Sequence, residues 1–126
     1  MIVTDDRVAK FVGEKLGFGV FPPYTCLGTE KDGEIIGGVI FNCFESVDLH
    51  ATVAGRGFNR TFLKAVGDYV FNQLGYERIT AITEDENIVM LAQRLGGELE
   101  GCLRNHFGRG RHGMICGILR DEYRFK

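Results

Sequence analysis

The stretch Gly55-Arg56-Gly57 carries the most specific chemistry in the sequence, because it joins an alternating segment to a helical pattern. The first turn of a helix exposes unpaired N–H groups and a partial positive charge, so it favours acidic side chains. Here Arg56 and Arg60 flank the start of the helix instead, and no acid is near. An external phosphate or pyrophosphate docked on the turn would remove this conflict. A tight turn with solvated arginines is the alternative interpretation.

This glycine turn differs from the two best-known phosphate-binding motifs. No Gly-Lys-Ser/Thr follows it, which excludes the Walker phosphate loop. The dinucleotide fingerprint needs a third glycine and a second strand that ends in an acid about 20 residues later, and both are missing. The anion that docks here is therefore expected to belong to another kind of ligand.

A second basic segment, Gly108 to Gly113, contributes Arg109, Arg111 and His112. We expect it to be an exposed hairpin loop. It could also attract an acidic acceptor or a nucleic acid, but two arginines support that weakly. The formal net charge of −2 also argues against a general nucleic-acid binder.

The four cysteines bear on metal binding and on compartment. They form no C-x-x-C pair and lie in apolar segments, which favours buried, reduced thiols over a zinc site. The three histidines are isolated, so we expect no metal. No apolar run approaches the ~18 residues that span a bilayer, and the N-terminus lacks the order of a signal peptide. The sequence therefore predicts a cytoplasmic protein without a membrane segment.

Hydrophobic periodicity and turn residues divide the chain into helices and strands. Apolar spacing of three and four residues predicts helices over residues 4–16, 59–74 and 86–95. Alternating or continuous apolar segments predict strands over residues 24–30, 34–44, 46–54, 78–83, 99–107 and 114–120.

The order of these elements predicts an α/β fold of one domain, residues 1–126. The unit 46–83 is strand, turn, helix, strand, which normally gives parallel strands with a right-handed crossover. The hairpins on either side are antiparallel. We therefore expect a central mixed β-sheet flanked by helices.

Three sequence segments resemble the GNAT superfamily of acetyl-coenzyme A-dependent N-acetyltransferases. The first is VAGRGFNRTFLKAVGDYVFNQLGYERITA, similar to the family's pyrophosphate turn, long helix and following strand. The second is Glu86-Asn87 with the later run LAQRLGGELEGCLRN, and the third is the tail GILRDEYRF. These segments are similar to the branch that acetylates ribosomal-protein N-termini. The resemblance covers about residues 25–125.

The resemblance implies a GNAT-like fold with a β-α-β coenzyme-binding core and acetyl-coenzyme A as co-substrate. The acetyl group would move directly to an amine acceptor, without a covalent enzyme intermediate. Backbone groups of Thr52 and Val53 would pair with the pantetheine arm, which Asn87 would also contact. The residues implied to hold the pyrophosphate are Gly55, Arg56, Gly57, Phe58, Asn59 and Arg60.

Acetyl transfer to an amine often needs a base that takes the amine proton. His50 lies on the polar face of the strand before the turn, and an imidazole titrates near neutral pH. Glu84 ends the neighbouring strand and could face the same cleft. Glu45 and Asp48 lie farther back. For each of these residues a structural role is the alternative.

The sequence also departs from the family pattern. Ala54 replaces an arginine or glutamine, and Asn59 stands where glycine or alanine lets phosphate approach, although it could instead cap the helix. The tyrosine that many members use as an acid is absent; the matching position is near Ala92. A catalytically degraded GNAT-fold binding or assembly module is therefore the alternative function.

The acceptor is the least transferable part, because the family commonly builds its site in the N-terminal region, which is short here. It could be a small amine, a polyamine, a lysine or a protein N-terminus. A homodimer is possible through the last strands.

Overall fold

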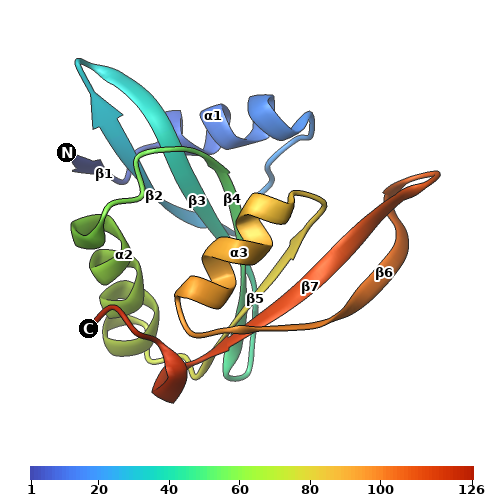
Figure 1. Cartoon of the computed structure of the whole chain (residues 1–126). Helices are drawn as coiled ribbons and strands as arrows, with labels where there is room; N and C mark the ends of the chain where they lie inside the picture. Colours follow the sequence, from blue (N-terminus) through green and yellow to red (C-terminus); the bar gives the residue numbers. More distant parts are fainter.

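The computed structural model describes residues 1–126 and contains one mixed sheet of seven strands in the order β1-β2-β3-β4-β5-β7-β6 (Figure 1). All neighbouring strands are antiparallel except β4 and β5, which are parallel. The expected mixed sheet is thus confirmed. The strands are β1 (Ile2–Val3), β2 (Thr25–Lys31), β3 (Glu34–Glu45), β4 (Asp48–Gly55), β5 (Arg78–Thr83), β6 (Glu98–Gly108) and β7 (Arg111–Leu119).

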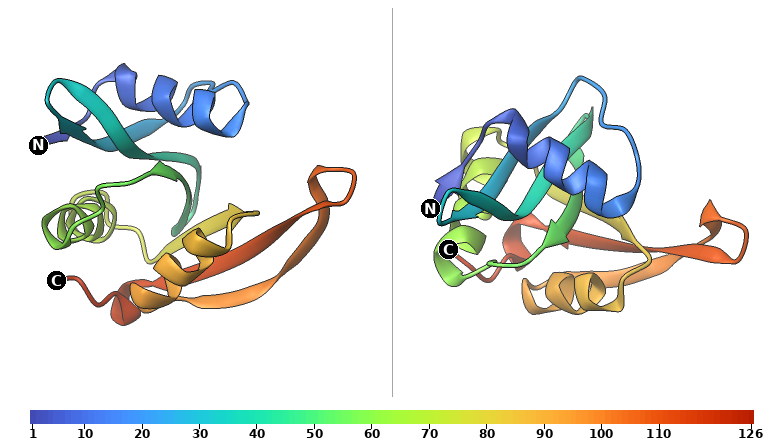
Figure 2. Two further views of the ribbon diagram at one scale, coloured as in Figure 1. Left: turned by 45° about the horizontal axis from the view of Figure 1, so that its top comes forward. Right: turned by 90° about the horizontal axis from the view of Figure 1, so that it is seen from above.

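Helices cover both faces of the sheet. Helix α1 (Asp6–Leu16) lies on one face, whereas α2 (Arg60–Gly67) and α3 (Glu86–Arg94) lie on the other (Figure 2). Each face has its own apolar core, because side chains alternate along a strand. In β3, for example, Phe41 packs on the α2 and α3 side and Ile40 on the α1 side.

Strands β4 and β5 pair over only three residue pairs, and the sheet then opens. The last pair is His50 with Thr80. Beyond it, β4 continues along β3 as far as Gly55, and β5 continues along β7 as far as Thr83. The parallel unit predicted from residues 46–83 is therefore confirmed, and it contains a fork in the sheet at His50.

Three elements differ from the sequence prediction. The two-residue strand β1 was not expected, and it is too short to carry a periodic signal. The predicted helix 59–74 is α-helical only to Gly67 and continues as the π-helical turn η1 (Asp68–Gln73). The predicted loop 108–113 is mostly strand, so the β6–β7 hairpin turns only at its tip and projects beyond the sheet (Figure 2).

A tertiary contact lies at the junction between α2 and the π-helical turn. A Cβ atom at Gly67 would collide with the ring of Tyr123, whose hydroxyl donates a hydrogen bond to the Leu63 carbonyl. The ring of Tyr123 thus packs against α2 just before its hydrogen-bonding pattern changes. Tyr123 and Leu63 are 60 residues apart in the sequence, so local periodicity could not reveal this contact.

Two of the four cysteines also correct the prediction. Cys26 and Cys116 are buried thiols, as expected, but Cys43 and Cys102 are exposed. Cys102 lies on β6, which is the edge strand of the sheet, and this explains its exposure. None of the helices has the length and apolar composition that a bilayer crossing requires.

Candidate coenzyme and acetyl-transfer site

The glycine turn between β4 and α2 is held in place by the two strands behind it. Gly55 and Gly57 both have φ of +90°, which side chains rarely tolerate. The Arg56 N–H donates to the Ile36 carbonyl at 2.9 Å, and the Arg56 carbonyl accepts from the buried Thr29 hydroxyl at 3.1 Å. These bonds fix the backbone that leads into the helix.

The turn presents free donors to the outside. The backbone N–H groups of Gly57, Phe58, Arg60 and Thr61 have no hydrogen-bond partner in the chain. The first turn of α2 contains no acid, as the sequence suggested. Arg56 is exposed and makes no ion pair. Together these groups can hold a phosphate-type anion.

Asn59 takes the capping role that the sequence left open. Its side-chain oxygen accepts a hydrogen bond of 2.9 Å from the Phe62 N–H. One of the orphan donors of the helix is thereby satisfied by the protein itself. The amides that remain free for an anion at this turn are those of Gly57, Phe58, Arg60 and Thr61.

An apolar groove runs from the turn into the fork of the sheet, between α2 and α3. Val53 points into it from β4, and Ala81 points into it from β5. Its walls carry no polar side chain, and its free volume is about 50 Å³, so a short aliphatic segment fits and a longer arm needs α2 and α3 to move apart. The lining residues from the two helices and the turn are Phe58, Phe62, Leu63, Val66, Ile88, Leu91, Ala92 and Leu95.

The fork places the predicted backbone contacts at the mouth of this groove. Beyond His50, the edge of β4 that faces β5 has no strand partner. The backbone of Thr52 and Val53 is therefore open to a ligand in the groove. Because residues alternate, Val53 faces the groove and Thr52 faces the opposite side of the sheet.

His50 stands at the fork itself, half-buried, on the face opposite the groove. Below it, a polar network joins β4, β5 and β6. The Thr80 hydroxyl donates to Asp48 at 2.8 Å and accepts from Arg78 Nε at 2.9 Å. Arg78 also pairs with Glu100, and the hydrogen bond from Arg78 holds the pKa of that carboxyl below its usual value. The network occupies Asp48 and leaves the imidazole as the group next to the opening.

Glu84 and Asn87 lie at the other side of the fork, where β5 leads into α3. Glu84 is paired with Arg111 of the hairpin, and this hydrogen bond lowers the pKa of Glu84. A carboxylate with a lowered pKa is a weaker base. Asn87 lies in the first turn of α3, its N–H donates to Asp85 at 2.8 Å, and its residue is exposed.

The C-terminal tail adds groups that sequence reasoning missed. The predicted strand 114–120 is β7, and after it the chain turns at the 3-10 helix η2 (Arg120–Glu122) and packs against α2. The guanidinium groups of Arg60 and Arg94 lie 5.7 and 5.8 Å from the centre of the Phe125 ring. Arg60 is thus positioned beside the turn by an aromatic contact. The sequence signal for this contact was Phe125 itself, an aromatic residue in a charged tail.

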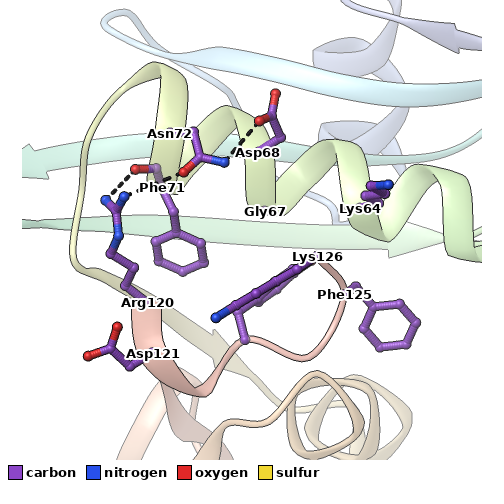
Figure 3. Close-up of a pocket in the computed structure, with 10 residues that line it drawn as sticks. Lys64, Gly67, Asp68, Phe71, Asn72, Arg120, Asp121, Phe125 and Lys126 are labelled. Atoms are coloured by element: carbon purple, nitrogen blue, oxygen red, sulfur yellow. Dashed lines mark hydrogen bonds between the residues drawn. The ribbon is translucent and has the colours of Figure 1, made fainter.

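The tail also forms one wall of a pocket of about 340 Å³ on the outer side of α2 (Figure 3). Its other wall is α2 and η1. Arg120 spans the pocket end by donating to the Phe71 carbonyl. The lining contains both basic residues, Lys64, Arg120 and Lys126, and acidic residues, Asp68 and Asp121, so the pocket has no single charge preference.

Comparisons with known proteins identify the fold. No protein-family model matches the chain, and no curated protein matches it in sequence. Among solved structures, a variant of the spermidine N-acetyltransferase SpeG from Vibrio cholerae matches with a TM-score of 0.77 at 17% identity, covering 98% of this chain and 95% of that one. A SpeG structure in complex with CoA and spermine matches with a TM-score of 0.72 at 16% identity over 97% of both chains.

The chain therefore has the GNAT fold, as its sequence resemblance implied. At this level of identity the match establishes the fold alone. The finer resemblance to the branch that acetylates ribosomal-protein N-termini remains a prediction.

Proposed function

We propose that the chain is a single-domain acetyl-coenzyme A-dependent N-acetyltransferase. The observation that carries the proposal is the fork between β4 and β5, with an apolar groove on one face and an anion-binding turn at its mouth. A ligand with a diphosphate joined to an aliphatic arm matches an anion-binding turn that leads into an apolar groove. The SpeG structures share the fold, and one of them contains CoA.

The residues of the chain divide the work as follows. The amides of Phe58, Arg60 and Thr61, together with Arg56, hold the diphosphate. The groove holds the arm, and Asn87 and the free edge of Thr52 and Val53 bond to its amide groups. The coenzyme supplies an acetyl group as a thioester. Free N–H groups of β4 near Val53 stabilise the negative charge that develops on the carbonyl oxygen.

His50 is the proposed base. It lies at the fork, on the face away from the groove, so an amine that approaches from that face meets the imidazole beside the thioester position. His50 takes the proton that the amine loses when the new C–N bond forms, and the C–S bond breaks to release the coenzyme as a thiolate, which the protonated imidazole can neutralise. We assign Glu84 a structural role, because Arg111 already holds it.

The acceptor class is proposed as a small amine. A SpeG structure contains spermine, which supports a polyamine-type acceptor. A lysine or a protein N-terminus is the competing acceptor, and an amine panel that includes peptides separates the two. The exposed free thiols of Cys43 and Cys102 suit the reducing cytoplasm that the sequence predicted.

Arg56→Glu tests the proposal. Acetyl-coenzyme A is expected to raise the melting temperature of the wild-type protein, since a ligand that binds the folded state stabilises it. The substitution should remove most of this rise by placing a negative charge beside the diphosphate. Arg109→Glu, an equal charge change on the hairpin, is the control and should keep the rise. No rise in the wild-type protein would refute coenzyme binding.

A catalytically inactive binding module is the second candidate. The observation that favours it is Ala92, a buried residue of the groove. Many family members carry near this position the tyrosine that acts as the general acid. This candidate predicts that the coenzyme raises the melting temperature while mass spectrometry finds no acetylated amine. Acetyl transfer that falls when His50 is replaced by glutamine would exclude it.

A further inference from the structure

The residues that follow η2 link the two helices that form the walls of the apolar groove. The Tyr123 hydroxyl donates to the Leu63 carbonyl of α2, and the Arg124 N–H donates to the Leu95 carbonyl at the end of α3 at 2.9 Å. Leu63 and Leu95 both line the groove. The tail therefore crosses the rim of the groove, and Figures 1 and 2 show its last residues beside α2.

Phe125 adds a second link between the helices, outside the first one. The centre of its ring lies 5.7 Å from the guanidinium of Arg60 at the start of α2 and 5.8 Å from that of Arg94 in the last turn of α3. The ring also packs against the main apolar core. Because Arg60 begins α2 and Leu63 lies about one turn farther along, the Phe125 link is the one nearer the anion-binding turn.

The inner link at Tyr123 and the outer link at Phe125 differ in strength. Tyr123 is buried, whereas Phe125 is half-buried and both arginines are exposed. Neither Arg60 nor Arg94 has an ion-pair partner, so two like charges are held near one ring and repel each other. A cation–π contact at an exposed site shifts an equilibrium by only about twofold to fivefold. The outer link can therefore open while the inner link holds the tail in place.

The groove that these links cross is nearly closed. Its free volume is about 50 Å³, whereas sites for small organic ligands usually measure about 300–1,000 Å³. Helices α2 and α3 therefore have to separate before a long arm can enter, and Phe125 bridges them on the side of the anion-binding turn. The same ring holds the side chain of Arg60, whose backbone N–H is one of the free donors of that turn.

We propose that Phe125 straps α2 to α3 in the free protein and that this strap opens when the coenzyme binds. Opening breaks both cation–π contacts, releases the guanidinium of Arg60 towards the diphosphate, and lets the two helices separate about the inner link. Part of the free energy of coenzyme binding drives this opening, so the closed strap lowers the apparent affinity. The inference rests on the proposed binding of acetyl-coenzyme A.

Calorimetric titration with acetyl-coenzyme A tests the effect of the strap on affinity. Phe125→Leu keeps an apolar side chain against the core and removes the aromatic face. It should raise the affinity by about fivefold to thirtyfold, the product of the two contacts. Phe21→Leu, the same change at an exposed residue of the loop before β2, is the control and should leave the affinity unchanged. Melting curves verify that both variants fold.

The direction of the change in affinity decides between the strap and its alternatives. An unchanged affinity in Phe125→Leu means that no strap opposes binding. A reduced affinity means that Phe125 presents Arg60 to the ligand, which also overturns the strap. If neither the wild-type protein nor Phe125→Leu binds the coenzyme, the proposed function fails together with the strap, so the two failures are distinguished.

Fluorescence tests the movement itself. The chain contains no tryptophan, so Phe125→Trp introduces a single reporter that keeps an aromatic face for both arginines. Acetyl-coenzyme A should shift its emission to longer wavelength, because the indole leaves the two helices for water. Phe21→Trp is the matched control and should show no shift. If the melting temperature of the Phe125→Trp protein rises with the coenzyme while its emission stays constant or moves to shorter wavelength, the ring remains covered and the strap is wrong.

Discussion

At the scale of single residues, Asn59 decides how many donors the turn offers to an anion. Its side chain caps α2 through the Phe62 N–H, at the position where the family pattern expects glycine or alanine. The cap stabilises the free protein and reduces the donors left for a ligand. An anion is then bound by the remaining free amides and Arg56 alone, so its affinity depends strongly on the charge of the side chains at this turn.

The substitution Asn59→Asp separates the capping of α2 from the binding of an anion at the turn. The carboxylate still accepts from the Phe62 N–H and favours the helix N-terminus by about 0.3–1 kcal/mol, so the free protein should be equally or more stable. The same charge repels the diphosphate, and coenzyme affinity should fall by up to about tenfold. Calorimetric titration measures the affinity. Asn59→Ser, a neutral cap, is the control, and an equal loss with serine would show that charge is not the cause.

At the scale of secondary-structure elements, the C-terminal tail shapes α2. Tyr123 is 3% exposed, and burial raises the pKa of its phenol, so the hydroxyl stays protonated and continues to donate to the Leu63 carbonyl. This contact lies where the α-helix gives way to the π-helical turn. It links the tail to the helix that starts at the anion-binding turn.

Tyr123→Phe should therefore destabilise the protein by about 0.5–1.5 kcal/mol, because it removes a buried hydrogen bond between the tail and α2. Thermal unfolding measures the change. Tyr69→Phe removes a hydroxyl from a bond of 2.8 Å to Thr25, which is largely exposed, and serves as the control with a small expected effect. Equal losses in the two variants would contradict the special role of the Tyr123 contact.

The pairing of Arg78 with Glu100 gives the elements around the fork a pH dependence. Since the folded pKa of Glu100 is lowered, the pair stabilises the fold at pH values above the ordinary glutamate pKa of about 4.3. That contribution is lost as the pH falls through the folded pKa. The carboxylate is 37% exposed, so solvent weakens the effect.

Glu100→Gln should lower stability at neutral pH and leave it nearly unchanged at low pH. Denaturant unfolding at several pH values between neutral and acidic conditions measures the difference. Glu98→Gln on the same strand is the control, because Glu98 has no partner within the chain. A difference between Glu100→Gln and wild type that stays constant with pH would contradict the ion-pair explanation.

At the scale of the whole molecule, the fork divides the site between the two faces of the sheet. The apolar groove lies under α2 and α3, and His50 lies on the face that carries α1. A coenzyme arm and an acceptor amine can therefore meet through the opening without competing for space. This arrangement predicts that substitutions at neighbouring residues of β4 affect either coenzyme binding or the reaction of the acceptor amine, depending on the face to which the side chain points.

Val53→Phe and Thr52→Phe test that division. Phenylalanine at position 53 fills the groove and should abolish the melting-temperature rise with acetyl-coenzyme A in a protein that still folds. Phenylalanine at position 52 projects from the other face and should keep that rise while acetyl transfer to the amine slows. Each variant is the control for the other. Loss of coenzyme binding in both would show that the two faces are not separate.

Much of this architecture could be predicted from local patterns. Alternation along residues 46–54 and the glycine turn predicted a β-α-β unit, and parallel pairing of β4 with β5 confirmed it. The helix and strand ranges were close to those observed, because periodicity reports directly which side of an element is buried. The sequence predicted neither the π-helical turn nor the exposure of the Cys43 and Cys102 thiols. Both features depend on distant neighbours or on strand order.

The sequence by itself determined the free donors of the turn, because its glycines, its arginines and the absence of acids are local properties. Only the tertiary structure decided that β4 and β5 part at His50, that Phe125 holds Arg60, and that β6 is an open edge. The physical reason is the range of the interactions. Helix polarity and backbone freedom act within a few residues, whereas strand order and tail packing join segments that no local pattern connects.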